Sequence, residues 1–235
     1  MKFWLIVPAA GIGSRMQADR PKQYLQVAGK SILEHTLEVF LGCAQLQRIV
    51  LPLASHDHWW PNLPLASHPH ITAIEGGRER ADSVLAGLRA LSTLGAAADD
   101  WVLVHDAARP LLHADDLQRL LDTLRDDPVG GLLGCPARDT LKLVDAEGRS
   151  QRTLPREHIW QALTPQMFRL QPLTIALTAA LEAGAAITDE ASAMEWQGYA
   201  PRLVAGRSDN IKITQPEDMQ LLAALHAGCQ VTQNA

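Results

Sequence analysis

The sequence predicts an α/β fold, with a Rossmann-like, mostly parallel sheet flanked by helices. Short apolar segments alternate with segments of helical periodicity along most of the 235 residues. The apolar segments end in turn residues, as the buried strands of parallel sheets do. The chain is 47% hydrophobic and 20% charged, a composition typical of a globular protein with a packed core.

Five apolar segments are expected to form strands, and four segments of helical periodicity are expected to form helices. The expected strands are FWLIVPA (3–9), RIVLPL (48–53), ITAIEGG (71–77), WVLVHD (101–106) and GGLLGCP (130–136). The expected helices are SILEHTLEVFLG (31–42), RADSVLAGLRAL (80–91), ADDLQRLLDTLRDD (114–127) and about 215–227. Sheets of this kind bind ligands beyond the carboxyl ends of their strands, which directs attention to residues 9–22, 76–83 and 106–110.

The alternation is interrupted by DTLKLVDAEGRSQRTLP (139–155), which has the pattern of a β-hairpin turning at residues 146–148. The segment has little apolar surface to bury, and an isolated hairpin is only marginally stable in water. We therefore expect an arm at about 138–156 that projects and packs against a second subunit. Because the sequence has no internal repeat or flexible linker, residues 1–235 are expected to form a single domain with this arm.

Charge, hydropathy and cysteine content exclude several classes of protein. The net charge of −5 argues against general binding to nucleic acid or to an anionic membrane. No apolar run approaches the roughly 20 residues that span a bilayer. The first apolar run leads directly into a glycine turn, so it is expected to be a strand rather than a signal peptide. The cysteines Cys43, Cys135 and Cys229 form no C-x-x-C pair and are expected to be reduced, which indicates a cytoplasmic protein.

The first expected strand runs into a glycine-rich loop, in the segment VPAAGIGSRMQADRPKQ (7–23). A dinucleotide fingerprint fails because Met16 stands where the third glycine or alanine is required. A P-loop around GKS (29–31) fails because Tyr24 stands at a glycine position, and Ser31 is the expected N-cap of the next helix. What remains is a loop able to approach phosphate closely that carries Arg15 and Lys22. From spacing alone, these cations are either a phosphate site or solvated surface residues.

A second candidate segment is VHDAARP (104–110), at the carboxyl end of an expected strand. Asp106 is costly to bury there unless it is paired or binds a metal ion. Arg109 supplies either a structural partner for this carboxylate or a fork for phosphate, and spacing leaves both interpretations open. His105 is expected to be a strand residue with a satisfied ring rather than a catalyst.

Two polar segments near the C-terminus carry weaker signals. ITDEASAMEW (187–196) has the pattern of a helix start, with Thr188 and Asp189 as possible caps and Glu190 in the first turn. GRSDNIKITQPEDM (206–219) places Asp209 and Lys212 in a polar loop before a helix. Taken alone, each segment is consistent with a purely structural role.

Read in order, these segments resemble the 2-C-methyl-D-erythritol 4-phosphate cytidylyltransferase family. The matching strings are PAAGIGSRM…PKQY, GGRERADSVLAGL, VHDAARP, DTLK, TPQMF, TDEASAMEW and DNIKITQPEDM. They extend from residue 8 to residue 219 in the family's order. The first loop alone indicates only the wider nucleotidyltransferase superfamily, whereas its combination with HDAARP and TDEAS is much more specific. Arg78 and Leu163 stand at positions where family identity is not required.

The resemblance implies a reaction of CTP with methylerythritol phosphate that yields CDP-methylerythritol and pyrophosphate, in non-mevalonate isoprenoid synthesis. It implies that Arg15 and Lys22 stabilise the transition state and that Arg156 and Lys212 position the acceptor phosphate. The residues implied to line the acceptor site are Asp106, Arg109, Thr140 and Thr188. The groups implied to hold the cytidine are the main chains of Ala9, Ala10 and Gly11, together with Gly77 and Ser83. The hairpin would be a dimerisation arm, so that Arg156 would act in the partner's site.

This chemistry agrees with the residues present. The acceptor phosphate is already ionised near pH 7, so it needs no general base, and catalysis is chiefly positioning and charge neutralisation. Mg²⁺ is the expected cofactor, bridging the triphosphate oxygens, with Asp106 the first and Asp209 the second choice of a protein group near it.

Three other functions remain as alternatives at this point. The nearest is a cytidylyltransferase for ribitol phosphate or another sugar phosphate. A non-catalytic nucleotide-binding regulator would be expected to lack Arg15 and Lys22, and Met16 disfavours a nicotinamide oxidoreductase.

Overall fold

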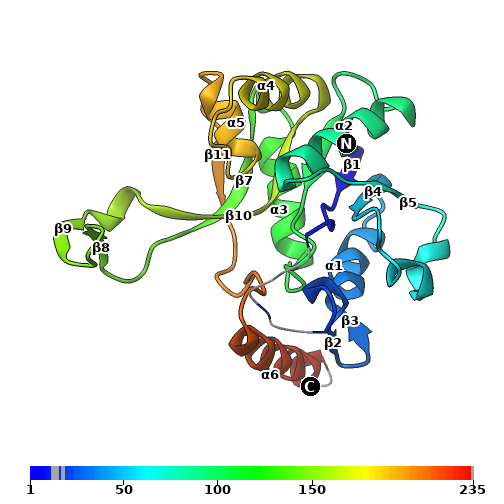
Figure 1. Cartoon of the computed structure of the whole chain (residues 1–235), viewed down its shortest axis with the longest axis horizontal. Coiled ribbons are helices and arrows are strands. Elements are labelled where there is room, and N and C mark those ends of the chain that lie inside the picture. The colour runs from blue at the N-terminus through cyan, green and yellow to red at the C-terminus, as the bar shows by residue number, and fades with distance from the viewer. Residues whose placement is uncertain (12–15, 17–18, 234–235) are drawn as a thin grey trace.

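The computed structural model describes residues 1–11, 16 and 19–233, with the side chains of the C-terminal helix described through residue 227. A seven-stranded sheet in the order β11-β7-β10-β6-β1-β4-β5 forms its centre, with helices packed against it (Figure 1). The predicted α/β fold is therefore confirmed. No helix within the described ranges is long and apolar enough to cross a membrane.

Six strands of this sheet share one direction, and the seventh runs against its neighbours. The strands are β1 (Phe3–Ile6), β4 (Leu46–Leu53), β5 (Ile71–Glu75), β6 (Trp101–Val104), β7 (Gly130–Pro136), β10 (Trp160–Arg169) and β11 (Arg202–Ala205). The five expected strands correspond to β1, β4, β5, β6 and β7. Strand β10 runs antiparallel between β6 and β7, and its register with β7 shifts between Ala162 and Gln166.

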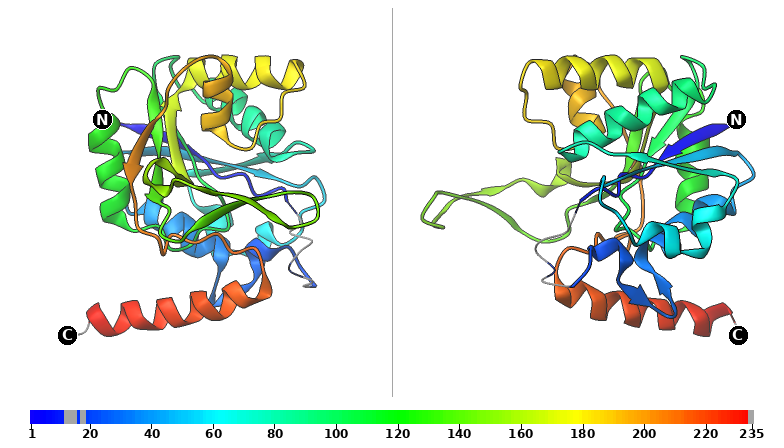
Figure 2. Two further views of the ribbon diagram at one scale, coloured as in Figure 1. Left: turned by 90° about the vertical axis from the view of Figure 1, so that its left-hand side faces the viewer. Right: turned by 45° about the vertical axis from the view of Figure 1, so that its right-hand side comes forward.

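Helices cover both faces of the sheet, as the continuous apolar runs of its central strands require. On one face, α1 (Ile32–Leu41) and α3 (Ala114–Leu124) pack against side chains such as Phe3 and Leu5. On the other face, α2 (Arg80–Thr93), α4 (Leu170–Glu182) and α5 (Glu190–Trp196) pack against side chains such as Ile6 and Val102 (Figures 1 and 2). Alternate residues of each strand therefore point into two separate cores.

Local sequence signals explain where several helices begin. Ser31 caps α1, and Glu34 completes a capping box with it, as the expected N-cap role requires. Asp189 caps α5 in the same way through Ser192. The last helix, α6 (Pro216–Gln233), extends beyond its expected end and lies beside the short hairpin of β2 (Gln26–Val27) and β3 (Lys30–Ser31) (Figure 2).

The hairpin expected at about 138–156 is present and projects away from the sheet (Figures 1 and 2). It consists of β8 (Leu141–Val144) and β9 (Ser150–Leu154), which pair in antiparallel fashion. Asp145 closes the turn by accepting the main-chain N–H of Glu147 and Arg149, and Gly148 supplies a φ of +77°. Most of its residues are exposed, including the apolar Leu143 and Val144.

Candidate active site

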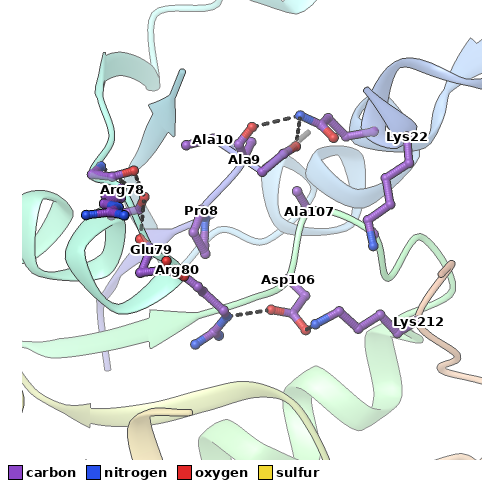
Figure 3. A pocket seen from close by; sticks show the side chains of 15 residues that line it. Pro8, Ala9, Ala10, Lys22, Arg78, Glu79, Arg80, Asp106, Ala107 and Lys212 are labelled. Atoms are coloured by element: carbon purple, nitrogen blue, oxygen red, sulfur yellow. Dashed lines mark hydrogen bonds and ion pairs between the residues drawn. The ribbon is translucent and has the colours of Figure 1, made fainter. Parts of the chain in front are cut away.

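A cleft of about 240 Å³ opens at the carboxyl end of the parallel strands, the edge predicted from the topology. Three segments line it: the loop after β1, the turn that leads into α2 and the turn after β6 (Figure 3). Lys22 and Lys212 reach it from two further segments. The structure thus brings together five residues predicted to hold the nucleotide, namely Ala9, Ala10, Gly11, Gly77 and Ser83, with Asp106, Lys22 and Lys212.

Asp106 lies at the centre of a cluster of cations. Its Oδ2 is 2.8 Å from Lys212 Nζ, and its Oδ1 accepts a hydrogen bond of 3.0 Å from Arg80 Nε (Figure 3). Arg109 Nε lies 3.6 Å from Oδ2, within ion-pair range but too long for a hydrogen bond. Of the two alternatives expected for a buried Asp106, pairing or a metal ion, the structure shows pairing, because both carboxylate oxygens face cations.

The charge state of Asp106 follows from this arrangement. Burial alone would raise the pKa of Asp106, but the charges of Arg80 and Lys212 outweigh burial and hold the pKa well below the usual range of a carboxyl. Burial lowers the pKa of Arg109, while the charge of Asp106 opposes that change. A guanidinium stays protonated near neutral pH, so the cluster combines one carboxylate with three cations.

Arg80 is a site residue that the sequence analysis did not identify. It stands at the first position of α2, and its Nη1 and Nη2 donate to Glu190 Oε1 and Oε2 at 2.7 and 3.1 Å. Glu190 stands at the first position of α5, and an acidic side chain is favoured in the first turn of a helix. Because the two helix starts are far apart in sequence, no local pattern indicates that their side chains meet.

Lys22 belongs to a 3-10 turn, η2 (Lys22–Tyr24), that begins after Pro21. Its Nζ donates to the carbonyl of Ile213 at 2.8 Å, next to Lys212 in sequence. The neighbouring Gln23 is buried, and its Nε2 donates to the carbonyls of Ala9 and Gly11 at 2.7 and 3.3 Å. Gln23 therefore ties the segment that carries Lys22 to the loop after β1. Arg15 lies outside the described residues.

The main-chain groups expected to hold a nucleotide are only partly available in this structure. The N–H of Ala9 donates to the carbonyl of Pro52 at 2.8 Å. The N–H of Gly77 donates to Ser83 Oγ at 3.0 Å, so two predicted nucleotide-binding residues contact each other. A Cβ at Gly77 would lie 2.2 Å from Asp82 Cβ, which explains why only glycine fits this turn.

Four predicted acceptor-site residues do not line the cleft of their own chain, and one of them, Arg109, is linked to it only through its ion pair with Asp106. Thr188 instead lines a second cavity of about 290 Å³, which shares Glu79 and Arg80 with the first. Thr140 lies just before β8 in the arm and is exposed. Arg156 lies after β9, at the base of the arm, and donates to the carbonyl of Arg138.

The two candidate metal ligands are poorly arranged for a cation. The Asp106 oxygens face the side chains of Arg80, Arg109 and Lys212, which would repel Mg²⁺. Asp209 accepts two hydrogen bonds from Arg207. Within the described part of the chain, no group of three or more His, Cys, Asp or Glu side chains could hold a metal ion. The protein groups around Asp106 therefore do not fit a resident Mg²⁺.

Comparison with known proteins identifies the family of this chain. The family model described as 2-C-methyl-D-erythritol 4-phosphate cytidylyltransferase matches residues 3–226. The chain belongs to this family. It is 63% identical over 221 residues to the cytidylyltransferase of that name from Ectopseudomonas mendocina, covering 94% of each chain. It is 61% identical over 217 residues to the Pseudomonas aeruginosa enzyme of that name, covering 92% of this chain and 93% of the relative.

Solved structures of cytidylyltransferases share the fold over nearly the whole chain. The Francisella tularensis 2-C-methyl-D-erythritol 4-phosphate cytidylyltransferase superposes with a TM-score of 0.82 at 35% identity, covering 94% of this chain and 98% of that one. The enzyme of the same name from Thermus thermophilus gives 0.78 at 31% identity, covering 96% and 98%. The resemblance inferred from the sequence motifs is therefore confirmed.

Proposed function

We propose that this protein joins CTP to 2-C-methyl-D-erythritol 4-phosphate to give 4-diphosphocytidyl-2-C-methyl-D-erythritol and pyrophosphate. Membership of the cytidylyltransferase family supports this activity, which belongs to non-mevalonate isoprenoid biosynthesis. The observation in the structure that carries the proposal is the cleft lined by Lys22, Lys212 and Arg80, in which Lys212 and Arg80 pair with Asp106. Such a cleft suits two phosphorylated substrates on a protein whose net charge is negative.

The proposed reaction is an in-line displacement at the α-phosphorus of CTP. An oxygen of the acceptor phosphate forms the new bond to that phosphorus, and the bond to the bridging oxygen of the β-phosphate breaks. Pyrophosphate leaves with that oxygen and its electron pair. The acceptor carries a charge of about −1.5 to −2 near pH 7, so no proton has to be removed from it. The barrier is repulsion between two anions, which fixed cations reduce.

Roles are assigned to Lys22, Lys212 and Arg80, which line the cleft, and to Arg109, which pairs with Asp106. Lys22, assigned with Arg15 to the α-phosphate, lies on the segment that Gln23 ties to the nucleotide loop. Lys212 is assigned to the acceptor phosphate, and Asp106 and Arg109 are assigned to the acceptor site around it. We further assign Arg80 to the support of Asp106, because its Nε donates to that carboxylate.

The nucleotide end of the cleft is assigned to the loop after β1 and the turn before α2. Ala9, Ala10 and Gly11 line it from one side, and Gly77 and Ser83 line it from the other. The small side chains leave room for a base beside the main chain, although several of its N–H and carbonyl groups already have partners within the protein. We assign the cytidine of CTP to this end.

We propose a homodimer in which the arm completes the partner's acceptor site. Support comes from Arg156 and Thr140, which lie on the arm and outside the cleft of their own chain. A hairpin with exposed Leu143 and Val144 also has apolar surface to bury against another chain. Thr188 is retained as an acceptor-site residue because Arg80, which lies against Asp106, also lines the cavity of Thr188.

Magnesium is proposed to enter as part of the CTP substrate, held by triphosphate oxygens, since the protein groups around Asp106 do not fit a resident ion. The proposed compartment is the cytoplasm. The described Cys43 and Cys135 are free thiols, which agrees with a reducing environment.

Pyrophosphate release across a panel of acceptors and nucleotides tests this function. We expect turnover with CTP and methylerythritol phosphate to exceed turnover with ribitol phosphate, other sugar phosphates, ATP or UTP. Preference for ribitol phosphate would replace the proposed acceptor. Binding of CTP without turnover on any acceptor would favour the nucleotide-binding regulator.

A further inference from the structure

Directly behind Asp106 lies a buried histidine that the proposed chemistry does not use. His105 is 0% exposed, and the ring of Phe40 meets its ring edge-on at 5.1 Å. Its Nε2 lies 3.1 Å from the main-chain carbonyl oxygen of Arg109, and its Nδ1 lies 3.0 Å from Thr164 Oγ1. Thr164 Oγ1 in turn accepts the main-chain N–H of Asp106 at 3.1 Å.

The groups linked by these three hydrogen bonds determine which atom of each pair carries the proton. A carbonyl oxygen only accepts, so Nε2 of His105 carries the proton that is donated to Arg109. In the neutral ring Nδ1 is then an acceptor, and it receives the hydroxyl proton of Thr164. The oxygen of that hydroxyl is left to accept the N–H of Asp106. Burial lowers the pKa of His105 to about 4, which agrees with a neutral ring.

The chain of hydrogen bonds holds both ends of the turn that carries Asp106 and Arg109. His105 reaches the far end through the carbonyl of Arg109 and the near end through Thr164. The middle of the turn is held separately, because the main-chain N–H of Ile213 donates to the carbonyl of Ala108 at 2.8 Å. Thr164 lies in the stretch of β10 where its register with β7 shifts, a type of irregularity that redirects side chains.

We propose that His105, as its neutral Nε2–H tautomer, is a positioning residue for the acceptor phosphate site. It acts through Thr164 and the Arg109 carbonyl to fix the distance and direction between the Asp106 carboxylate and the Arg109 guanidinium. This role rests on the proposed function, in which those two side chains contact the acceptor. In this role His105, the histidine of VHDAARP, positions other groups and transfers no proton.

The kinetic test compares His105→Phe and His105→Asn with wild type and with Leu173→Ala. Leu173 is a fully buried residue of α4 on the far face of the sheet, so its variant controls for lost stability. We expect His105→Phe to lower kcat/KM for methylerythritol phosphate about 100-fold, the scale on which misplaced groups slow catalysis. KM for CTP is expected to stay within about threefold of wild type.

Two further kinetic expectations concern the recovery of activity in His105→Asn and the coupling between His105 and Thr164. His105→Asn retains an acceptor for Thr164 and is expected to recover part of the loss, whereas Leu173→Ala lowers Tm without changing KM for the acceptor. Thr164→Val combined with His105→Phe is expected to be no slower than the worse single variant, because both break one chain. Acceptor kinetics of His105→Phe that match those of Leu173→Ala, or losses that multiply in the double variant, would overturn the proposal.

A spectroscopic test separates this proposal from the proposed function. Long-range ¹H–¹⁵N spectra of imidazole-labelled protein are expected to show His105 as the neutral Nε2–H tautomer. The amide of Asp106 is expected to lose hydrogen-exchange protection in His105→Phe, relative to Leu173→Ala. An Nδ1–H ring, an imidazolium, or unchanged protection would overturn the positioning role even if the enzyme is active. Wild-type protein that shows the expected spectra but no turnover would instead contradict the proposed function.

Discussion

The guanidinium of Arg80 lies end-on against the carboxylate of Glu190, with Nη–Oε distances of 2.7 and 3.1 Å, while its Nε donates to Asp106. The two partners stand 110 positions apart in sequence and start different helices. The Glu190 side chain is 1% exposed and that of Arg80 is 29% exposed. A buried carboxylate therefore holds the cation that holds Asp106.

Replacing Glu190 with alanine is expected to destabilise the fold by about 2 kcal/mol. Removing one partner of a fully buried ion pair costs about 3–5 kcal/mol, and the smaller figure applies because water reaches Arg80. Urea unfolding followed by circular dichroism measures the change. Glu195→Ala, at an exposed position of the same helix, is the matched control and is expected to change stability by less than about 0.5 kcal/mol. Equal effects of the two variants would show that the contact with Arg80 contributes no net stability.

Lys22→Ala is expected to lower kcat about 100-fold while KM for CTP stays within about threefold. The charge of Lys22 is assigned to the α-phosphorus, where negative charge builds up mainly in the transition state. Steady-state kinetics with CTP varied at saturating acceptor measures both constants. Lys30→Ala, which removes an exposed lysine paired with Glu38, is the control and is expected to behave as wild type. A kcat of Lys22→Ala within about twofold of wild type would remove Lys22 from its assigned role.

The sequence predicted five of the six parallel strands because each of the five is a largely apolar run, and it did not single out the sixth, β11. It did not single out β10 as a strand, since WQALTPQMFR mixes polar residues and a proline with apolar ones. Its antiparallel direction depends on pairing with β6 and β7, which is a tertiary property. The last helix was predicted too short because its final residues are mostly polar and interrupt the apolar periodicity on which the prediction rested.

The candidate site was predictable where one short segment forms both the turn at the end of a strand and the charged side chains on that turn. VHDAARP places Asp106 and Arg109 one turn apart, and the structure pairs them. Arg80 escaped detection because its partners Asp106 and Glu190 come from two other segments of the chain. Only the fold brings the starts of α2 and α5 to the carboxyl end of β6. The roles of arm residues such as Arg156 came from the resemblance to the family, because the spacing of residues in the sequence does not indicate them.

Mixing two inactive variants tests whether the arm serves the partner's site. Lys22→Ala removes a cation of the cleft, and Arg156→Ala removes a cation of the arm. In a mixed dimer one of the two sites keeps both residues, so we expect activity to return. Random exchange makes about half of the dimers mixed, so the activity is expected to reach up to about a quarter of wild type. Subunit exchange is verified by differently tagged chains. Mixed dimers as inactive as their parents would place Arg156 in the site of its own chain.

Removal of metal is expected to abolish turnover without changing the protein itself. The described residues contain no cluster that could hold an ion, so chelator-treated protein is expected to keep its Tm. Activity is expected to return in proportion to the Mg–CTP complex, because the triphosphate is the proposed carrier of the ion. Calorimetry of the protein with Mg²⁺ alone, and then with Mg²⁺ and CTP, distinguishes the two sources. Tight binding of Mg²⁺ to the protein without CTP would show a resident site.

The stability of the protein is expected to fall as the pH is lowered from 6.5 towards 4, and His105 is the cause. Its pKa is about 4 in the folded protein and 6.5 when unfolded, because burial penalises the charged ring. The hydrogen bond to the Arg109 carbonyl and the charge of Asp106 favour the charged ring but do not outweigh burial. Between these values the unfolded chain binds a proton that the folded chain does not, so up to about 3 kcal/mol is lost. The carboxylate of Asp106 adds its own loss only below pH 3.8. Urea unfolding at a series of pH values is expected to give a shallower slope for His105→Asn than for wild type, and parallel slopes would assign the loss to other groups.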